Sequence, residues 1–243
     1  MILAVDVGNT NTVVGLFDGK KLIKQWRMGS SVRAFSQIIS KIPQSIKGVI
    51  VSSVVPRLDQ PFRTLAKKKF GVTALFVSPH LKMPIRIKVK NPRQVGTDRI
   101  VNAVAAWTRW KQDLIVVDFG TATTFDVVTQ KGNYLGGVIT PGLGIINQAL
   151  PEKTAKLPLV PLKRPQKTIG RSTIEAIQSG VFLGYASLVD GMIQRIKKEF
   201  GSKMKVVATG GLAVLMACEC QLIDQVDPDL TLKGLQVLSA VKH

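Results

Sequence analysis

The sequence predicts an α/β fold built from two copies of one unit, each a mixed sheet flanked by helices. Apolar runs typical of strands alternate with helical runs along all 243 residues, as an α/β fold requires. A strand–turn–strand pattern at Ile2–Asp18 also recurs in the middle of the chain, at Leu114–Val128. We therefore expect one lobe at residues 1–112 and a second at residues 113–243.

The first hairpin has the chemistry of a phosphate-binding turn. Its first apolar run ends at Asp6, and Gly8 follows, where the missing side chain lets the backbone approach a ligand closely. Residues 9–12 offer amides, hydroxyls and backbone N–H groups that can cradle a phosphate. Asp6 could hold a magnesium ion. Taken alone, the segment is equally compatible with an ordinary polar hairpin, because short motifs are unspecific.

The second hairpin repeats the first at one constant spacing. Three positions correspond, namely Asp118 with Asp6, Gly120 with Gly8 and Thr124 with Thr12. A single Asp-x-Gly at a strand end is common, but two copies with matching flanks indicate a duplication. We expect the two hairpins to face each other across a cleft.

The other strands and helices follow from local patterns. Apolar and β-branched runs predict strands at Lys21–Met28, Gly48–Val54, Ala74–Val77, Tyr134–Ile139 and Lys205–Ala208. Helical runs, several of them bounded by Pro or Gly, are expected at Ala34–Lys41, Leu58–Phe70, Ile100–Trp110, from Gly144 to Leu150, and near the C-terminus. Strict alternation of apolar and basic residues at Pro84–Lys90 predicts a half-exposed strand at a sheet edge.

A long helix is expected from about Ser172 to Phe200, after a proline-rich loop at Pro151–Lys167. Ser172 and Glu175 stand in capping-box spacing at its start. Its expected inward stripe is Ile174, Ile177 and Val181. Gly180 and Gly184 cost helix stability, so we expect them to allow close packing, within the fold or between subunits.

Asp98 is the most informative residue between the two hairpins. It lies in the segment Asn91–Arg99, NPRQVGTDR, directly before a helical run. An acid near a helix start is favoured by the exposed N–H groups and the helix dipole, which is sufficient to explain Asp98 as a capping residue. The adjacent Arg99 is not needed by a cap and favours a functional role.

The composition limits the classes of function. Lys and Arg number 34 against 15 Asp and Glu, a formal charge of +19, which makes nucleic acid an obvious candidate partner. The basic residues are dispersed and only 6% of residues are aromatic, so we expect a solvated basic surface and no nucleic-acid interface.

Two further observations favour a soluble, cytoplasmic protein without a membrane span. No apolar run approaches membrane length, and the first one lacks a basic leader. Cys218 and Cys220 have no other Cys or His close in sequence, which favours reduced thiols over a zinc site.

The motifs together resemble those of the type III pantothenate kinases, in that family's order and nearly end to end. The matching blocks are DVGNTNTVVGLFDG, SSVVP, NPRQVGTDRIVNA, VVDFGTATTFDVV, LGGVITPGLG, IGRSTIEAIQSG, GYASLVDG, ATGGLA and DPDLTLKGL. The resemblance implies duplicated ribonuclease H-like lobes, as in the superfamily of acetate kinase, sugar kinases, Hsp70 and actin. It implies ATP-dependent phosphorylation of pantothenate to 4'-phosphopantothenate, the first step of coenzyme A biosynthesis, by a homodimer.

The resemblance also implies a role for each matching residue. ATP would be bound by Asp6, Val7, Gly8, Asn9, Thr10, Asn11, Thr12, Val13 and Thr121, with Mg²⁺ carried on the nucleotide near Asp6. Pantothenate would be bound by Gly96, Thr97, Asp98, Arg99 and Thr173. Asp98 would accept the hydroxyl proton, and Asp118 would help to hold a monovalent cation, K⁺ or NH₄⁺. No GxxxxGK[ST] motif occurs in the chain, which excludes a P-loop kinase.

One departure from the family pattern concerns the substrate side. Where relatives commonly carry Tyr-Asp before Asn-Pro, this chain has Val89-Lys90, so the substrate preference or the wall of the pocket differs. The departure and the positive charge motivate an alternative hypothesis. In it, the chain is a catalytically impaired family member that acts as a nucleotide- or nucleic-acid-binding regulator.

Overall fold

The computed structural model describes residues 1–241 and divides into two compact units. Unit 1 contains residues 1–111, residues 131–135 and the described residues from Asp229 onward. Unit 2 contains residues 112–130 and 136–228. The last helix therefore packs with the first part of the chain. The two lobes expected at residues 1–112 and 113–243 stay a prediction.

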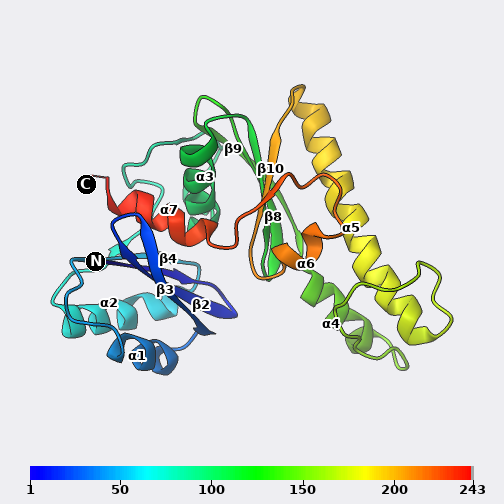
Figure 1. The fold of residues 1–243 in the computed structure, drawn as a ribbon, viewed down its shortest axis with the longest axis horizontal. Helices are drawn as coiled ribbons and strands as arrows, with labels where there is room; N and C mark the ends of the chain where they lie inside the picture. Colours follow the sequence, from blue (N-terminus) through cyan, green and yellow to red (C-terminus); the bar gives the residue numbers. More distant parts are fainter. Residues whose placement is uncertain (242–243) are drawn as a thin grey trace. The chain divides into compact units, whose positions relative to one another are not determined.

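Unit 1 is built on a sheet with the strand order β3-β2-β1-β4-β5 (Figure 1). The strands are β1 (Ile2–Val7), β2 (Asn11–Asp18), β3 (Lys21–Gly29), β4 (Gly48–Ser53) and β5 (Leu75–Phe76). β1 runs antiparallel to β2 and parallel to β4. The first three strands and β4 lie where the sequence predicts them.

The two faces of this sheet carry different helices. α1 (Val32–Ser40) and α2 (Pro56–Phe70) cover one face, where Phe35 and Phe62 stack with ring centroids 4.0 Å apart over Leu3 and Val5 (Figure 1). α3 (Thr97–Trp110) and α7 (Leu230–Ser239) lie on the other face. Because side chains alternate along a strand, Asp6 on β1 points to the α3 and α7 face.

Unit 2 repeats this architecture. Its strands are β7 (Leu114–Phe119), β8 (Ala122–Val128), β10 (Lys205–Thr209), β11 (Gln225–Val226) and β9 (Asn133–Pro141), of which residues 133–135 belong to unit 1. Their order is β9-β8-β7-β10-β11. Its helices are α4 (Leu143–Lys153), α5 (Thr173–Phe200) and the short α6 (Ala213–Ala217). Since this strand order matches that of unit 1 position for position, the predicted duplication is confirmed.

The two hairpins differ by one residue in the turn. In unit 1 Asp6 pairs with Val13, whereas in unit 2 Asp118 pairs with Thr124. The strand pairing therefore aligns Thr12 with Thr123, and the sequence-based match of Thr12 with Thr124 is wrong by one residue. The shorter turn of the second hairpin could not be recognised from the Asp and Gly positions, which match.

The edge strand at Pro84–Lys90 is shorter than predicted. Only β6 (Arg86–Ile87) is paired, with the beginning of β9, at the end of the strand order. The alternation is nevertheless real, because Arg86, Lys88 and Lys90 are exposed while Ile85 is buried. A short 3₁₀ helix (Pro92–Gln94) then leads into α3.

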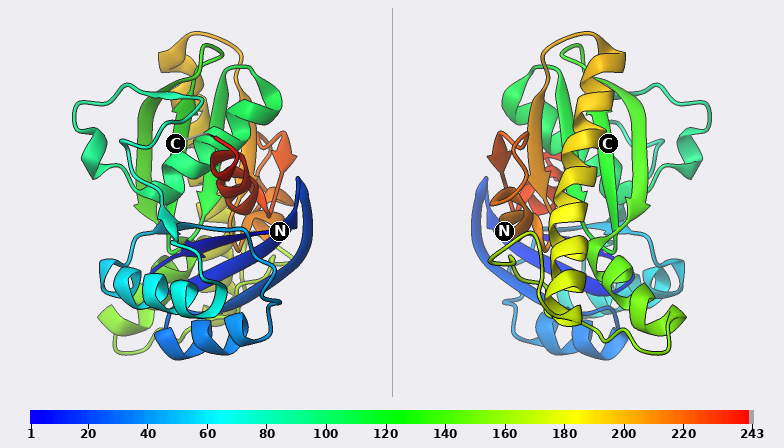
Figure 2. Two further views of the ribbon diagram at one scale, coloured as in Figure 1. Left: turned by 90° about the vertical axis from the view of Figure 1, so that its left-hand side faces the viewer. Right: turned by 90° about the vertical axis from the view of Figure 1, so that its right-hand side faces the viewer.

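α5 lies along the sheet of unit 2, seen in the right-hand view of Figure 2. Ser172 is its N-cap, as the capping-box spacing predicts, and Glu175 N–H donates to Ser172 Oγ at 3.2 Å. The Glu175 carboxylate accepts from the N–H of Arg171, one residue before the N-cap, at 2.7 Å. Ile177 and Val181 are buried as expected, but Ile174 is 52% exposed. Within the described chain, no atom would lie within 4 Å of a Cβ at Gly180 or Gly184.

By length and composition alone, α5 is apolar enough to cross a membrane. The expectation that no stretch approaches membrane length is therefore wrong for this helix. Half of its most apolar window is buried inside the structure, and its buried side chains belong to the core of unit 2. A buried core helix can meet these length and hydropathy criteria without crossing a membrane.

Candidate active site

The turn between β1 and β2 is held by hydrogen bonds that leave its tip exposed. Gly8 N–H donates to Asn11 O at 3.0 Å, and Ser30 N–H donates to Thr10 O at 3.2 Å. The Ser30 hydroxyl donates to Gly8 O at 2.5 Å and lies 3.0 Å from Thr12 Oγ1. Ser30, which the sequence analysis missed, therefore fixes the turn from the end of β3.

Asp98 lies in the first turn of α3. The N-cap residue of α3 is Gly96, so Asp98 is not the cap; one carboxylate oxygen accepts from Arg99 N–H at 2.8 Å. A Cβ at Gly96 would lie 2.5 Å from Asp98 Oδ1, so any larger residue at this position would displace the carboxylate. Burial raises the pKa of Asp98 above its ordinary 3.8, against the opposing effects of the Arg99 N–H and the Arg99 charge.

Thr97, next to Asp98, is bonded to the end of β4. Its hydroxyl lies 3.1 Å from Ser52 Oγ, accepts from Ser53 N–H at 3.1 Å and donates to Ser53 O at 3.1 Å. Ser52 is completely buried and is the register partner of Asp6 on the neighbouring parallel strand. Unit 1 thus joins the predicted phosphate-binding strand and the predicted proton acceptor through one short network.

Unit 2 carries a corresponding row of polar residues on the sheet face opposite α5. Thr209, Asp118 and Thr124 are register partners across β10, β7 and β8. Thr124 donates to the carboxylate of the buried Asp126 at 3.0 Å. Among the described residues, the completely buried Thr209 hydroxyl finds no hydrogen-bond partner.

Gly210, directly after Thr209, packs against Asp118 and Phe119. Its φ is +94°, and a Cβ would lie 2.4 Å from Asp118 Oδ1 and 2.7 Å from the backbone N and O of Phe119. The backbone therefore approaches the Asp118 carboxylate as closely as only glycine permits. A carboxylate with an unbonded hydroxyl beside it is a donor set of the hard oxygen type that suits K⁺ or another hard cation, so the residues present fit such an ion.

The remaining predicted site residues lie at element ends. Thr121 is in the turn of the second hairpin, where its carbonyl accepts from Gly142 N–H at 3.0 Å. Thr173 is the first residue of α5 and is exposed. Val89, at the position where relatives commonly have tyrosine, is half-buried, and Lys90 is exposed.

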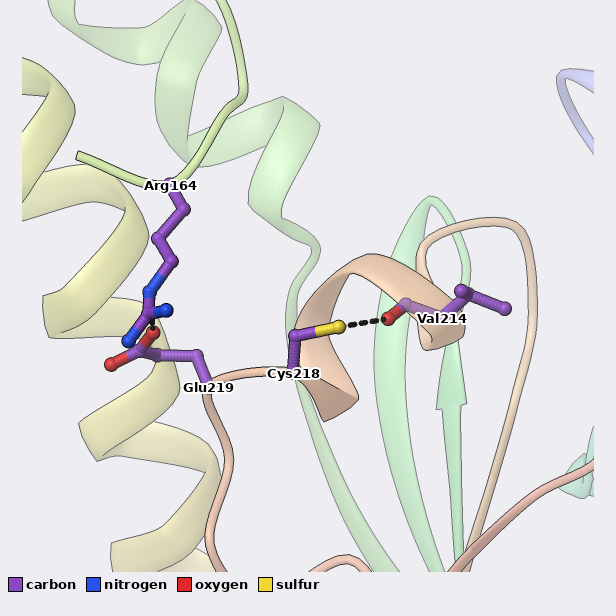
Figure 3. A network of polar contacts seen from close by, with 4 residues as sticks. All are labelled: Arg164, Val214, Cys218 and Glu219. Carbon is purple, nitrogen blue, oxygen red and sulfur yellow. Dashed lines mark hydrogen bonds and ion pairs between the residues drawn. The ribbon is translucent and has the colours of Figure 1, made fainter. Parts of the chain in front are cut away.

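Cys218 and Cys220 lie just after α6 as free thiols, as expected. Cys218 Sγ donates to Val214 O at 3.3 Å (Figure 3). Burial raises the pKa of the Cys220 thiol to about 12. In residues 1–241 no group of three or more His, Cys, Asp or Glu side chains is arranged to hold a metal ion. The nearby Arg164–Glu219 ion pair, 2.7 Å long, ties the loop before α5 to the segment after α6.

The chain matches known proteins along its whole length. The family model described as "Type III pantothenate kinase" matches residues 2–195. The type III pantothenate kinase of Myxococcus xanthus is 45% identical over 254 residues, covering 100% of this chain and 99% of that protein.

Solved structures show the same fold at lower identity. A protein from Campylobacter jejuni, described as a putative Baf family transcriptional activator, has a TM-score of 0.63 at 20% identity and covers 97% of this chain and 96% of that one. The polyphosphate/ATP-glucomannokinase of Arthrobacter sp. strain KM has a TM-score of 0.54 at 14% identity and covers 100% and 99%. These likenesses confirm the expected fold of the sugar kinases and actin. With the family model and the relatives in agreement, the chain belongs to the type III pantothenate kinase family.

Proposed function

We propose that the residues described above carry out the reaction of the family, the ATP-dependent phosphorylation of pantothenate to 4'-phosphopantothenate. The observation that carries the proposal is the connection in unit 1 between two strands and α3. Ser52 is the register partner of Asp6, and its hydroxyl lies 3.1 Å from that of Thr97, the residue before Asp98. This connection links the strand of the predicted phosphate turn to a carboxylate whose pKa is raised. The 45% identity to a pantothenate kinase over the full length of this chain favours an active kinase over a catalytically impaired regulator.

Asp98 is the proton acceptor in this proposal. Transfer of a phosphoryl group to an alcohol needs a carboxylate that takes the hydroxyl proton as the new O–P bond forms. A raised pKa makes the Asp98 carboxylate a stronger base than that of an ordinary aspartate. Arg99, beside it, orients pantothenate, and Gly96 and Thr173 complete the contacts.

The turn from Asp6 to Val13 binds the phosphates of ATP. Its N–H groups and the side chains of residues 9–11 at the exposed tip serve as donors, and Thr121 makes a further nucleotide contact. Mg²⁺ bound with ATP, near Asp6, would neutralise part of the phosphate charge. Asp118 holds a monovalent cation, K⁺ or NH₄⁺, with the free Thr209 hydroxyl as a second oxygen ligand.

The protein acts as a homodimer in the cytoplasm. The α5 end of unit 2 supports the dimer, because Ile169 and Ile174 there are 84% and 52% exposed. Gly180 and Gly184 leave open space on the same helix for the approach of a second chain.

The activity is tested by incubating the purified protein with pantothenate, ATP, MgCl₂ and KCl and detecting the product by mass. Formation of 4'-phosphopantothenate, dependent on both ATP and pantothenate, is the expected result. Absence of product at every concentration, together with salt-sensitive binding of duplex DNA, would favour the regulator instead.

A further inference from the structure

The Thr97 hydroxyl has no hydrogen-bonding capacity left for a substrate. A hydroxyl donates one hydrogen bond and accepts two. Thr97 Oγ1 donates to Ser53 O and accepts from Ser53 N–H, both at 3.1 Å. Since its one hydrogen is used, the contact with Ser52 must be donated by Ser52, and this fills the second acceptor position.

The two residues that bond the Thr97 hydroxyl, Ser52 and Ser53, are themselves held in place by β4 and its neighbours. Ser52, near the end of β4, is completely buried and is the register partner of Asp6 on β1. Ser53 is fixed in turn, since its hydroxyl donates to Asp59 Oδ1 at 2.5 Å and accepts from Val55 N–H at 3.2 Å. The first turn of α3 is therefore bonded to a fixed point on the sheet that also carries the phosphate-binding turn.

The corresponding place in unit 2 shows that this bonding is specific to unit 1. Thr209 occupies the position next to Asp118 that Ser52 occupies next to Asp6. Its hydroxyl is equally buried, but within the described chain it has no hydrogen-bond partner. The buried hydroxyl next to Asp118 therefore exists without a hydrogen bond to a helix residue. The bond between Ser52 and Thr97 is a feature of unit 1 alone among the described residues.

We propose that Thr97 is a positioning residue: its hydroxyl fixes the first turn of α3, and with it the Asp98 carboxylate, to the end of β4. Its side chain does not bind pantothenate. This inference rests on the proposed role of Asp98 as proton acceptor. Gly96, which directly precedes Thr97, also lies close to this carboxylate, since a Cβ at Gly96 would lie 2.5 Å from Asp98 Oδ1.

The expected consequence is a loss in turnover without a loss in substrate affinity. A displacement of about 1 Å at a reacting group can cost about 10²-fold in rate. Thr97→Val removes the hydroxyl and keeps the shape, so we expect kcat to fall between about tenfold and 10²-fold, with KM for pantothenate unchanged. Thr97→Ser keeps the hydroxyl and should restore most of kcat.

Thr108→Val is the matched control on the same helix. The Thr108 hydroxyl is also buried, but no described group bonds it, so its removal should leave kcat and KM unchanged. Ser52→Ala, which breaks only one of the three bonds, should lower kcat less than Thr97→Val, and the double variant should be no slower than Thr97→Val alone.

A rise in KM for pantothenate with unchanged kcat in Thr97→Val would show that the hydroxyl binds substrate and would overturn the proposal. So would a normal kcat in Thr97→Val, or a failure of Thr97→Ser to restore it. If Thr97→Val does not fold, as judged by circular dichroism, Thr97→Ser and Ser52→Ala decide in the same way. Activity retained by Asp98→Asn would instead refute the role of Asp98, a separate failure.

Discussion

Asp118 and Thr209 are register partners on the parallel strands β7 and β10, and the Thr209 hydroxyl beside the carboxylate is buried with no partner among the described residues. In unit 1 the equivalent pair is Asp6 and Ser52, where the hydroxyl is bonded to Thr97. One duplicated position therefore serves two purposes. In unit 1 the hydroxyl bonds a helix residue, whereas in unit 2 we propose that the hydroxyl is a ligand of a cation.

Thr209→Val should leave the thermal stability of the protein unchanged or higher while it weakens the response to K⁺. Leaving a buried hydroxyl unbonded costs about 1–3 kcal/mol, so the variant should unfold at the same or a higher temperature without KCl. It should also lose part of the stabilisation that added KCl gives the wild type, and need more K⁺ for half-maximal activity. Thermal unfolding across a KCl series measures both; an unchanged K⁺ response would remove Thr209 from the cation site.

Ser30→Ala should weaken ATP binding selectively. The Ser30 hydroxyl bonds Gly8 O and Thr12 Oγ1, so its loss loosens the turn, and we expect KM for ATP to rise several-fold while KM for pantothenate stays constant. Ser31→Ala is the neighbouring control. It removes the N-cap of α1 and should cost about 1 kcal/mol of stability without changing either KM. Equal KM effects in both variants would contradict the role of Ser30.

Asp98 should reduce the stability of the folded protein at neutral pH. Because its pKa is raised in the folded state, the stability it contributes is present at acid pH and is lost as the pH rises through the raised pKa. Asp98→Asn should therefore unfold at a higher temperature than the wild type at pH 7, with the difference shrinking toward pH 4. An exposed control, Asp18→Asn, accounts for the loss of one charge. A lower unfolding temperature for Asp98→Asn at pH 7 would contradict a raised pKa.

Gly184 tests the proposed dimer. The wild type should have the mass of a dimer in size-exclusion chromatography with light scattering. Gly184→Arg should shift it to a monomer, because a long charged side chain would occupy the open space on α5. Gly184→Ala, which improves helix propensity by about 1 kcal/mol but stays small, should remain a dimer. A monomeric wild type would refute the proposal.

The sequence predicts the elements of this fold better than their pairing. Alternation and β-branched runs located the main strands, and the capping box placed the start of α5 at Ser172. The one-residue difference between the hairpins was not visible, because the Asp and Gly positions match and the difference lies in how the strands pair.

The sequence predicts those residues of the candidate site whose side-chain type and motif already indicate a role. Asp6, Asp98 and Asp118 were recognised from their motifs. The hydrogen bonds of Ser30 and Ser52 and the unbonded hydroxyl of Thr209 were not predicted, because they depend on contacts between segments far apart in sequence. Thr97 was expected at the substrate, and only its three bonds to β4 suggest another role.

The proposed role of Asp98 is that of proton acceptor in a pantothenate kinase. It is tested most directly by quantifying 4'-phosphopantothenate by mass spectrometry for the wild type and for Asp98→Asn at saturating ATP, pantothenate, Mg²⁺ and K⁺, with ATP binding measured by calorimetry. We predict product from the wild type, a loss of at least about 10²-fold in kcat for the variant and unchanged ATP affinity. Normal turnover by Asp98→Asn would contradict the account.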